Sequence, residues 1–485
     1  MEQRLDRAGP PHAYTGVPLA SGPHAEPVFH GSPPPDGSTP APLPGEWGGA
    51  QCAAFLDALR RSGDDAADDL VRRLRAQGVP RDASRRYFAA LAAHSGSLSD
   101  AVREVEGPDG LVEFARSALH VCELCDGVTL PRGIDRAKVV RGQIAFETRS
   151  LPCLLVLLCK SLPEGYAAPS MAQVLSLSGT LVDQPYHRLM GTLHLLVTVG
   201  SRGSFEGPFQ RAVLAAFQIR LLHAGVRTVV APAVPANTRP YWPGYDEYHR
   251  DGRVPVNFED MLGTIIGFSL LVITGLERLG IPFDADDAEA YYYTWRTFAQ
   301  LMGIHPPGRP NDASYLPPTL ADAEAFYALY SQRNYVGPTT LDRGFDARAE
   351  AENPAGVALA RSHVEMLTRL LPGGRRLPSL SVIPRFFVRQ LCGDEATARV
   401  GVRPAPLHGL LEAILVRAPA WWVRRWGRMD RGIHAAITRW FLRGLVHHVY
   451  RGGVQYFVPY TTEDLLALVD EGQRGRGVTA SAGRA

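Results

Sequence analysis

Three residues near the middle of the chain, Arg220, His223 and Arg227, have types and spacings that suit an anionic ligand with a metal at its centre. They stand three and four positions apart, so on a helix of 3.6 residues per turn they share one face. The segment that carries them, Gly207–Val230, is otherwise apolar and is predicted to form one long helix. Burying such groups without partners is unfavourable, by about 2–7 kcal/mol even for an uncharged one.

A haem group would remove this unfavourable free energy. Its iron takes a neutral imidazole as an axial ligand, and its propionates accept charge-assisted hydrogen bonds from arginine. We therefore predict that His223 binds the iron and that Arg220 and Arg227 point toward the propionates. Two alternatives stay open. His223 is a core histidine bonded to a backbone carbonyl, or the arginines are solvated or paired with Asp or Glu of a neighbouring helix.

Three segments, taken in order, resemble the latex-clearing protein family, which comprises rubber oxygenases and related MpaB-type oxygenases. They are RLLHAGVR (220–227), PVNFEDMLGTIIGFS (255–269) and AEAYYYTWRTFAQLMGI (288–304). The resemblance is clear over residues 133–303 and extends further only in helical character. It implies a mainly helical protein with a globin-like core that carries haem b, in which arginines like these flank the ligand histidine.

The resemblance also implies a distal side of the haem, about one helix before the ligand histidine. The family has an arginine and a threonine four residues apart there, and Arg188 and Thr192 match them. Thr192 would hydrogen-bond dioxygen, and Arg188 would tie its helix to the haem, so both are the predicted catalytic residues. The alternatives are an exposed arginine and a threonine that bonds its own helix. His194, two residues on, is expected to be structural.

Two departures from the rubber-cleaving members concern this distal side. Gly191 stands where those members have a lysine able to reach the iron, and a glycine can neither ligate nor protonate. Rubber cleavage is also thought to use a carboxylate base, yet between Ser170 and Asp183 the only acid is Asp183 itself. The resemblance therefore supports the fold and the haem more directly than it supports cleavage of a polymer.

The composition is that of an ordinary globular chain, with 45% hydrophobic and 21% charged residues among 485. A net charge of +2 gives no reason to expect a nucleic-acid partner. Only Lys138 and Lys160 are lysines beside 49 arginines, which weakens a functional interpretation of any single arginine. The six cysteines form no disulfide pattern, and Cys122-Glu-Leu-Cys125 is interpreted as structural.

The sequence predicts an all-α fold, with a globin-like helical haem core and additional N- and C-terminal helices. The expected regions are a disordered proline-rich segment (1–48), a helical N-terminal region (49–130), the haem-binding oxygenase domain (131–470) and a flexible tail (471–485). Asn257, Glu259 and Asp260 are interpreted as a helix cap and first turn.

Neither a secretory signal nor an uninterrupted membrane-spanning stretch is recognised, so a cytoplasmic protein is expected. This differs from the best-known rubber-degrading members, which act outside the cell. In Trp421–Ile433, tryptophans line one helix side and arginines the other, which fits peripheral contact with a membrane interface. The alternative is that the tryptophans pack on the core.

These patterns favour a haem b-dependent oxygenase that acts with dioxygen on an apolar, unsaturated substrate of isoprenoid or lipid type. The alternatives are a peroxidase-like haem enzyme, a helical haem-binding or sensor protein without turnover, and a helical interaction protein without a cofactor. The sequence leaves the oligomeric state open.

Overall fold

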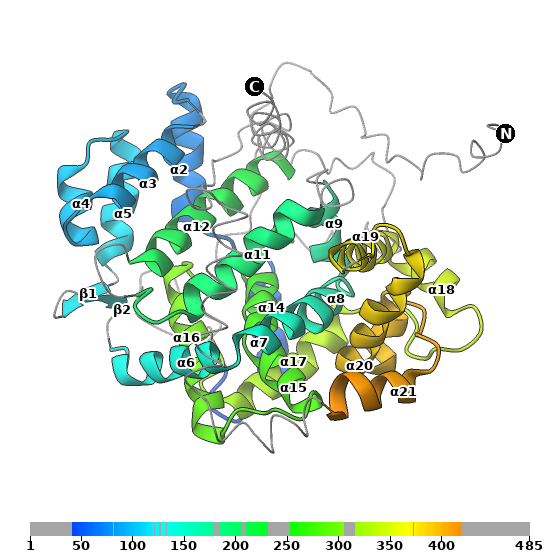
Figure 1. The fold of residues 1–485 in the computed structure, drawn as a ribbon. Helices are drawn as coiled ribbons and strands as arrows, with labels where there is room; N and C mark the ends of the chain where they lie inside the picture. Colours follow the sequence, from blue (N-terminus) through cyan, green and yellow to red (C-terminus); the bar gives the residue numbers. More distant parts are fainter. Residues whose placement is uncertain are drawn as a thin grey trace, which may run out of the picture.

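The structure is a computed structural model that describes residues 41–80, 82–120, 122–125, 128–131, 133–177, 185–205, 210–230, 253–304, 316–371 and 373–418. Over these residues the chain is helical, which confirms the all-α fold (Figure 1). The globin-like arrangement stays a prediction. The predictions for the first forty residues, for Trp421–Ile433 and for the tail 471–485 lie outside the described residues.

The N-terminal region contains five helices and a small hairpin. They are α1 (Ala50–Leu59), α2 (Asp65–Ala76), α3 (Ala83–Ala93), α4 (Leu98–Glu104), α5 (Asp109–His120), β1 (Cys122–Cys125) and β2 (Val128–Pro131). The antiparallel hairpin is an addition to the predicted helical N-terminal region (49–130). Its Cys-Glu-Leu-Cys stretch is too short to show an alternating pattern. Helix α2 begins where the Asp64 side chain accepts a hydrogen bond from the backbone N–H of Ala67.

The middle of the chain contains α12 (Arg211–Val230), which at 20 residues is the longest helix of the described structure. The elements before it are α6 (Arg136–Thr148), α7 (Ser150–Val156), the π-helix η1 (Leu157–Ser161), α8 (Leu162–Gly165), α9 (Pro169–Leu177) and α11 (Pro185–Gly200). The described part of helix α11 starts at Pro185, and proline is favoured in the first turn of a helix because the N–H it lacks has no partner there. Helix α12 is the predicted central helix, and α11 lies beside it in Figure 1.

The remaining helices complete the fold. They are α14 (Phe258–Phe268), α15 (Leu270–Arg278), α16 (Ala285–Leu301), α17 (Leu320–Asn334), α18 (Phe345–Glu352), α19 (Pro354–Leu370), the 3₁₀ helix η2 (Pro378–Ser381), α20 (Val382–Arg399), α21 (His408–Glu412) and the π-helix η3 (Ala413–Arg417). The segment Phe258–Arg278 is long and apolar enough for a membrane span, but 78% of its apolar window is buried inside the protein. Such burial is equally typical of a core helix.

One hydrophobic cluster runs through the whole described structure and includes side chains from α1 to η3. Helices α2–α5 lie at one end of the molecule and α18–α21 at the other, with α12 and α16 between them (Figure 1). Helices α6 and α16 approach closely at Gly142, where an added Cβ would lie 2.2 Å from the Ala290 carbonyl oxygen. Helix α12 packs against α2, α3, α11 and α16, so the candidate site is surrounded by helices far apart in sequence.

Candidate functional site

His223 lies on α12 with apolar side chains on one side and charged side chains on the other. Its imidazole is half-buried, as are Leu222 and Val226, whereas Leu221 and Ala224 are fully buried. At 100° per residue, Leu222 and Val226 project to one side of His223, and both flanking arginines project to the other. His223 therefore has an apolar, partly exposed side and a charged side.

Arg220, on the charged side, is held by Asp64 at the start of α2. Its Nε donates to one Asp64 carboxylate oxygen at 2.6 Å, and its NH2 donates to the other at 3.0 Å. The guanidinium also lies over the Phe114 ring, 4.8 Å from the centroid. An added Cβ on Gly303, after α16, would lie only 3.0 Å from the Arg220 Nε. The Arg220 side chain is therefore enclosed by protein groups.

Arg227 is held in the same way by Asp68, one turn further along α2. Its Nε donates at 2.8 Å, its NH2 lies 2.8 Å from the same carboxylate, and its NH1 donates to the Val256 carbonyl oxygen at 3.1 Å. The Arg227 side chain is fully buried. Gly63 lies against it, since a Cβ there would be 3.3 Å from the Arg227 Nε.

The structure shows the ion-pair alternative for these two arginines. Both guanidinium groups engage carboxylates of a neighbouring helix, which is the ion-pair alternative, instead of pointing away from the protein toward a ligand. The physical reason is that α2 brings two aspartates onto the face of α12 that carries the arginines. A contact between Arg220 or Arg227 and haem propionates stays a prediction.

The two aspartates differ in how strongly their charged forms are stabilised. Burial acts to raise the pKa of Asp64, but the charge and hydrogen bonds of Arg220, with Arg227 nearby, hold that pKa below its usual value. Burial raises the pKa of Asp68 to about 6, although Arg227 opposes the shift. The charged form of Asp64 is therefore the more strongly stabilised of the two.

Helix α11 carries the predicted distal residues and packs against α12. Gly191 and Thr192 are half-buried on α11. Arg188 belongs to the same helix, but its side chain lies outside the described part of the structure. Burial, together with the charge of Arg211, lowers the pKa of His194 to about 4, so His194 is neutral at pH 7. The structure brings the helices of Thr192 and His223 together, and a direct role of Thr192 stays a prediction.

The donor set around His223 suits haem. No group of three or more His, Cys, Asp or Glu side chains among the described residues is arranged to hold a metal ion. Haem iron needs only one protein ligand, because the porphyrin supplies four. The half-buried imidazole of His223 could supply that ligand, and half-buried Leu222 and Val226 place apolar side chains beside it.

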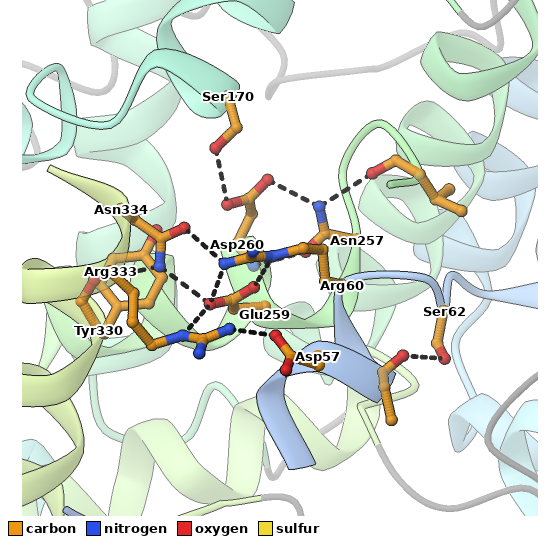
Figure 2. Close-up of polar contacts among 12 residues, drawn as sticks. Asp57, Arg60, Ser62, Ser170, Asn257, Glu259, Asp260, Tyr330, Arg333 and Asn334 are labelled. Carbon is orange, nitrogen blue, oxygen red and sulfur yellow. Dashed lines mark hydrogen bonds and ion pairs between the residues drawn. The ribbon is translucent and has the colours of Figure 1, made fainter. Parts of the chain in front are cut away.

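A second buried charged group, here called the Glu259 cluster, joins α14 to α1 and α17. It contains Glu259, Arg60, Arg333 and Asn334 (Figure 2). Glu259 accepts hydrogen bonds from Arg60 at 2.6 and 3.0 Å, from Asn334 at 2.9 Å and from Arg333 at 3.5 Å. The carboxylate is only 1% exposed. The first-turn interpretation of Glu259 was therefore incomplete, because it missed these distant partners.

Asp260 lies beside this cluster but points toward α9. It accepts hydrogen bonds from Ser170 at 3.1 Å and from the Asn257 amide at 2.9 Å (Figure 2). Asn257 caps α14 by accepting the Asp260 backbone N–H, which confirms the predicted cap. Burial raises the pKa of Asp260 to about 6, with the charge of Arg253 opposing the shift.

Comparison with known proteins gives three findings. The sequence pattern of the family described as "ER-bound oxygenase mpaB/B'/Rubber oxygenase, catalytic domain" matches residues 150–442. A rubber oxygenase of Streptomyces sp. (strain K30) is 22% identical over 234 residues, which are 48% of this chain and 47% of the relative, so the match spans about half the relative's length. The solved structure of latex clearing protein LCP in the closed state superposes with a TM-score of 0.57 at 17% identity, over 80% of this chain and 91% of that one. This likeness shows a shared fold.

Proposed function

The chain belongs to the family of mpaB/B' and rubber oxygenase catalytic domains, and from this membership we propose that it is a haem b-dependent oxygenase. Its substrate would be apolar and unsaturated, of isoprenoid or lipid type, with dioxygen as the second substrate. The observation that supports this most is the position of His223. It is half-buried between an apolar side and an ion-paired side of α12, next to the helix that carries Thr192.

The chain's own residues would divide the work as follows. His223 would hold the haem through a neutral imidazole on a long helix. Leu222 and Val226 would cover the macrocycle and exclude water on that side. Thr192 would donate its hydroxyl hydrogen to dioxygen on the distal side, with Arg188 tying α11 to the haem. The haem, when bound, supplies the redox chemistry toward dioxygen.

Gly191 bears on the substrate. The rubber-cleaving members have a lysine at this position, and a glycine leaves the volume of that side chain to the substrate or to water. We propose that the distal side is open in the resting protein and accepts small ligands such as cyanide without first displacing a protein amine. A slow displacement phase in cyanide binding would contradict this.

The test of the proposed function is oxygen uptake by purified, haem-loaded protein in the presence of an isoprenoid oligomer. Thr192→Val removes the hydroxyl and nearly keeps the shape, so it should retain haem and lose most of the substrate-dependent uptake, by about 10²-fold or more. The matched control is Thr228→Val, because the Thr228 hydroxyl bonds the Ala224 carbonyl within α12. A protein that holds haem but consumes no oxygen with any unsaturated substrate would be a haem-binding or sensor protein.

A further inference from the structure

Two ion pairs attach α12 to α2, one on either side of His223. Asp64 and Asp68 are four residues apart on α2, and Arg220 and Arg227 are seven apart on α12. We call these four residues the α12 clamp. A helix shifted by one residue rotates by 100° and moves by 1.5 Å, which would break both pairs. The clamp therefore fixes the rotation and the height of the turn that carries His223.

The surroundings of the clamp make it rigid. Phe114 and Gly303 enclose the Arg220 guanidinium, and Gly63 with the Val256 carbonyl encloses that of Arg227. Arginine offers a planar fork of donors, and two of these donors bind the two oxygens of Asp64. Such side chains have little freedom to turn toward a ligand.

We propose that Asp64 and Asp68 are positioning residues for the haem: through Arg220 and Arg227 they set the direction of the His223 imidazole. This inference rests on the proposed haem-dependent function. Both aspartates lie before the region that the family pattern matches, residues 150–442. Helix α2 would thus belong to the proposed haem site although it lies outside the residues that the family pattern matches.

A metal–imidazole bond depends on such support. The groups that orient a ligating histidine typically change metal affinity by about 10–100-fold when they are lost. Here the orienting groups act on the helix that carries the histidine. Loss of the Asp64 charge should therefore speed the release of haem while leaving the ligand in place.

The first experiment compares three aspartates of α2 and its N-cap in the haem-loaded full-length protein. Asparagine keeps the shape and the capping ability of aspartate but removes its charge. Release of haem to excess apomyoglobin should be about tenfold faster in Asp64→Asn and a few-fold faster in Asp68→Asn. Asp69→Asn is the matched control, because Asp69 pairs with Arg72 on the exposed side of the same helix and should leave the rate unchanged.

A double-mutant cycle separates positioning from direct contact with the haem. If Asp64 acts through Arg220, then Asp64→Asn should add nothing to the release rate of an Arg220→Gln protein. If Arg220 instead binds a propionate, Arg220→Gln should accelerate release far more than Asp64→Asn does, and the two effects should multiply. That result would overturn the proposal.

Gly63→Ala keeps the test decisive if the charge variants fail to fold. It adds one methyl group 3.3 Å from the Arg227 Nε and removes no charge. The proposal predicts faster haem release and a changed ferric absorption spectrum in this variant. A wild-type release rate in Gly63→Ala would overturn the positioning role alone, whether or not the charge variants fold. A wild-type protein that takes up no haem would overturn the proposed function as well.

Discussion

The α12 clamp and the Glu259 cluster contain the same residue types in different surroundings. Both pair buried arginines with carboxylates, and both use the turn between α1 and α2, through Arg60 on one side and Asp64 on the other. Glu259 is enclosed by donors from Arg60, directly after α1, and from α17. The clamp instead flanks His223, a half-buried imidazole with half-buried apolar neighbours.

The groups that surround a buried ion pair distinguish a functional site from a purely structural one. A carboxylate whose oxygens are all bonded within the protein connects helices and has no capacity left for a ligand. A ligand residue is recognised by the partly covered apolar surface beside it, together with rigid support behind it. We therefore assign the Glu259 cluster to folding and the α12 clamp to the proposed haem site.

The largest expected effect is on folding. Glu259→Gln leaves Arg60 and Arg333 beside a neutral amide and should reduce the free energy of unfolding by about 3–5 kcal/mol, as loss of a buried partner typically does. Glu395→Gln is the control, because its pair with Arg399 is exposed on the Glu395 side and should contribute less than about 1 kcal/mol. If urea unfolding of the two apoproteins gave equal losses of free energy, the Glu259 cluster would stabilise the fold no more than an exposed ion pair does.

Haem release, measured alongside stability, should distinguish the α12 clamp from the Glu259 cluster. Asp64→Asn should destabilise the apoprotein by about 3 kcal/mol, because Arg220 keeps its charge in a buried position. Folded Glu259→Gln protein should release haem at the wild-type rate, whereas folded Asp64→Asn protein should release it faster. If both variants release haem equally fast, the clamp has no special relation to His223.

A buried neutral group gives a third, pH-dependent case. The His363 imidazole Nε2 lies 2.7 Å from the Leu158 carbonyl oxygen, and burial lowers its pKa to about 4. The unfolded chain binds a proton below pH ~6.5 and the folded chain does not. The contribution of His363 to stability is therefore complete above pH ~6.5 and falls by about 1.4 kcal/mol per pH unit as the pH drops toward 4.

The check on His363 is urea unfolding of wild-type and His363→Gln apoprotein between pH 7 and pH 4.5. Glutamine keeps a donor toward Leu158 but does not titrate. The variant should show a shallower loss of stability across this window. An unchanged slope would mean that His363 is already protonated in the folded protein.

The smallest expected effect is that of Gly63→Ala on the stability of the apoprotein. Its methyl group displaces Arg227 by a few tenths of an ångström, so the loss should be about 1 kcal/mol. Gly409→Ala, where an added Cβ meets nothing within 4 Å, is the control and should be neutral or slightly stabilising. A loss of unfolding free energy as large as that in Asp64→Asn would mean that Arg227 cannot move to accommodate the added methyl group.

Local patterns in the sequence predicted the elements well. The apolar run around His223 predicted α12, and Asn257 predicted the cap of α14. These features depend on neighbours within one or two turns. The hairpin was missed because four-residue strands are too short for an alternating pattern to show.

The partners of the arginines could not be predicted in this way. Asp64 is 156 residues from Arg220 in the chain, and Arg60 is 199 residues from Glu259. A carboxylate at the start of a helix fits solvent and the helix dipole as well as a buried ion pair, so the sequence does not distinguish them. The sequence did show the acidic start of α2, but only the packing of α2 on α12 reveals that these aspartates pair with Arg220 and Arg227.

Whether His223 holds a haem can be read from the absorption spectrum of a His223→Ala variant. Purified wild-type protein should show a Soret band and a pyridine haemochrome of b type. His223→Ala should fold normally and lose the Soret band, and added imidazole should restore part of it by filling the vacated space. A His223→Ala protein with full haem content and an unchanged spectrum would show that His223 is not the haem ligand.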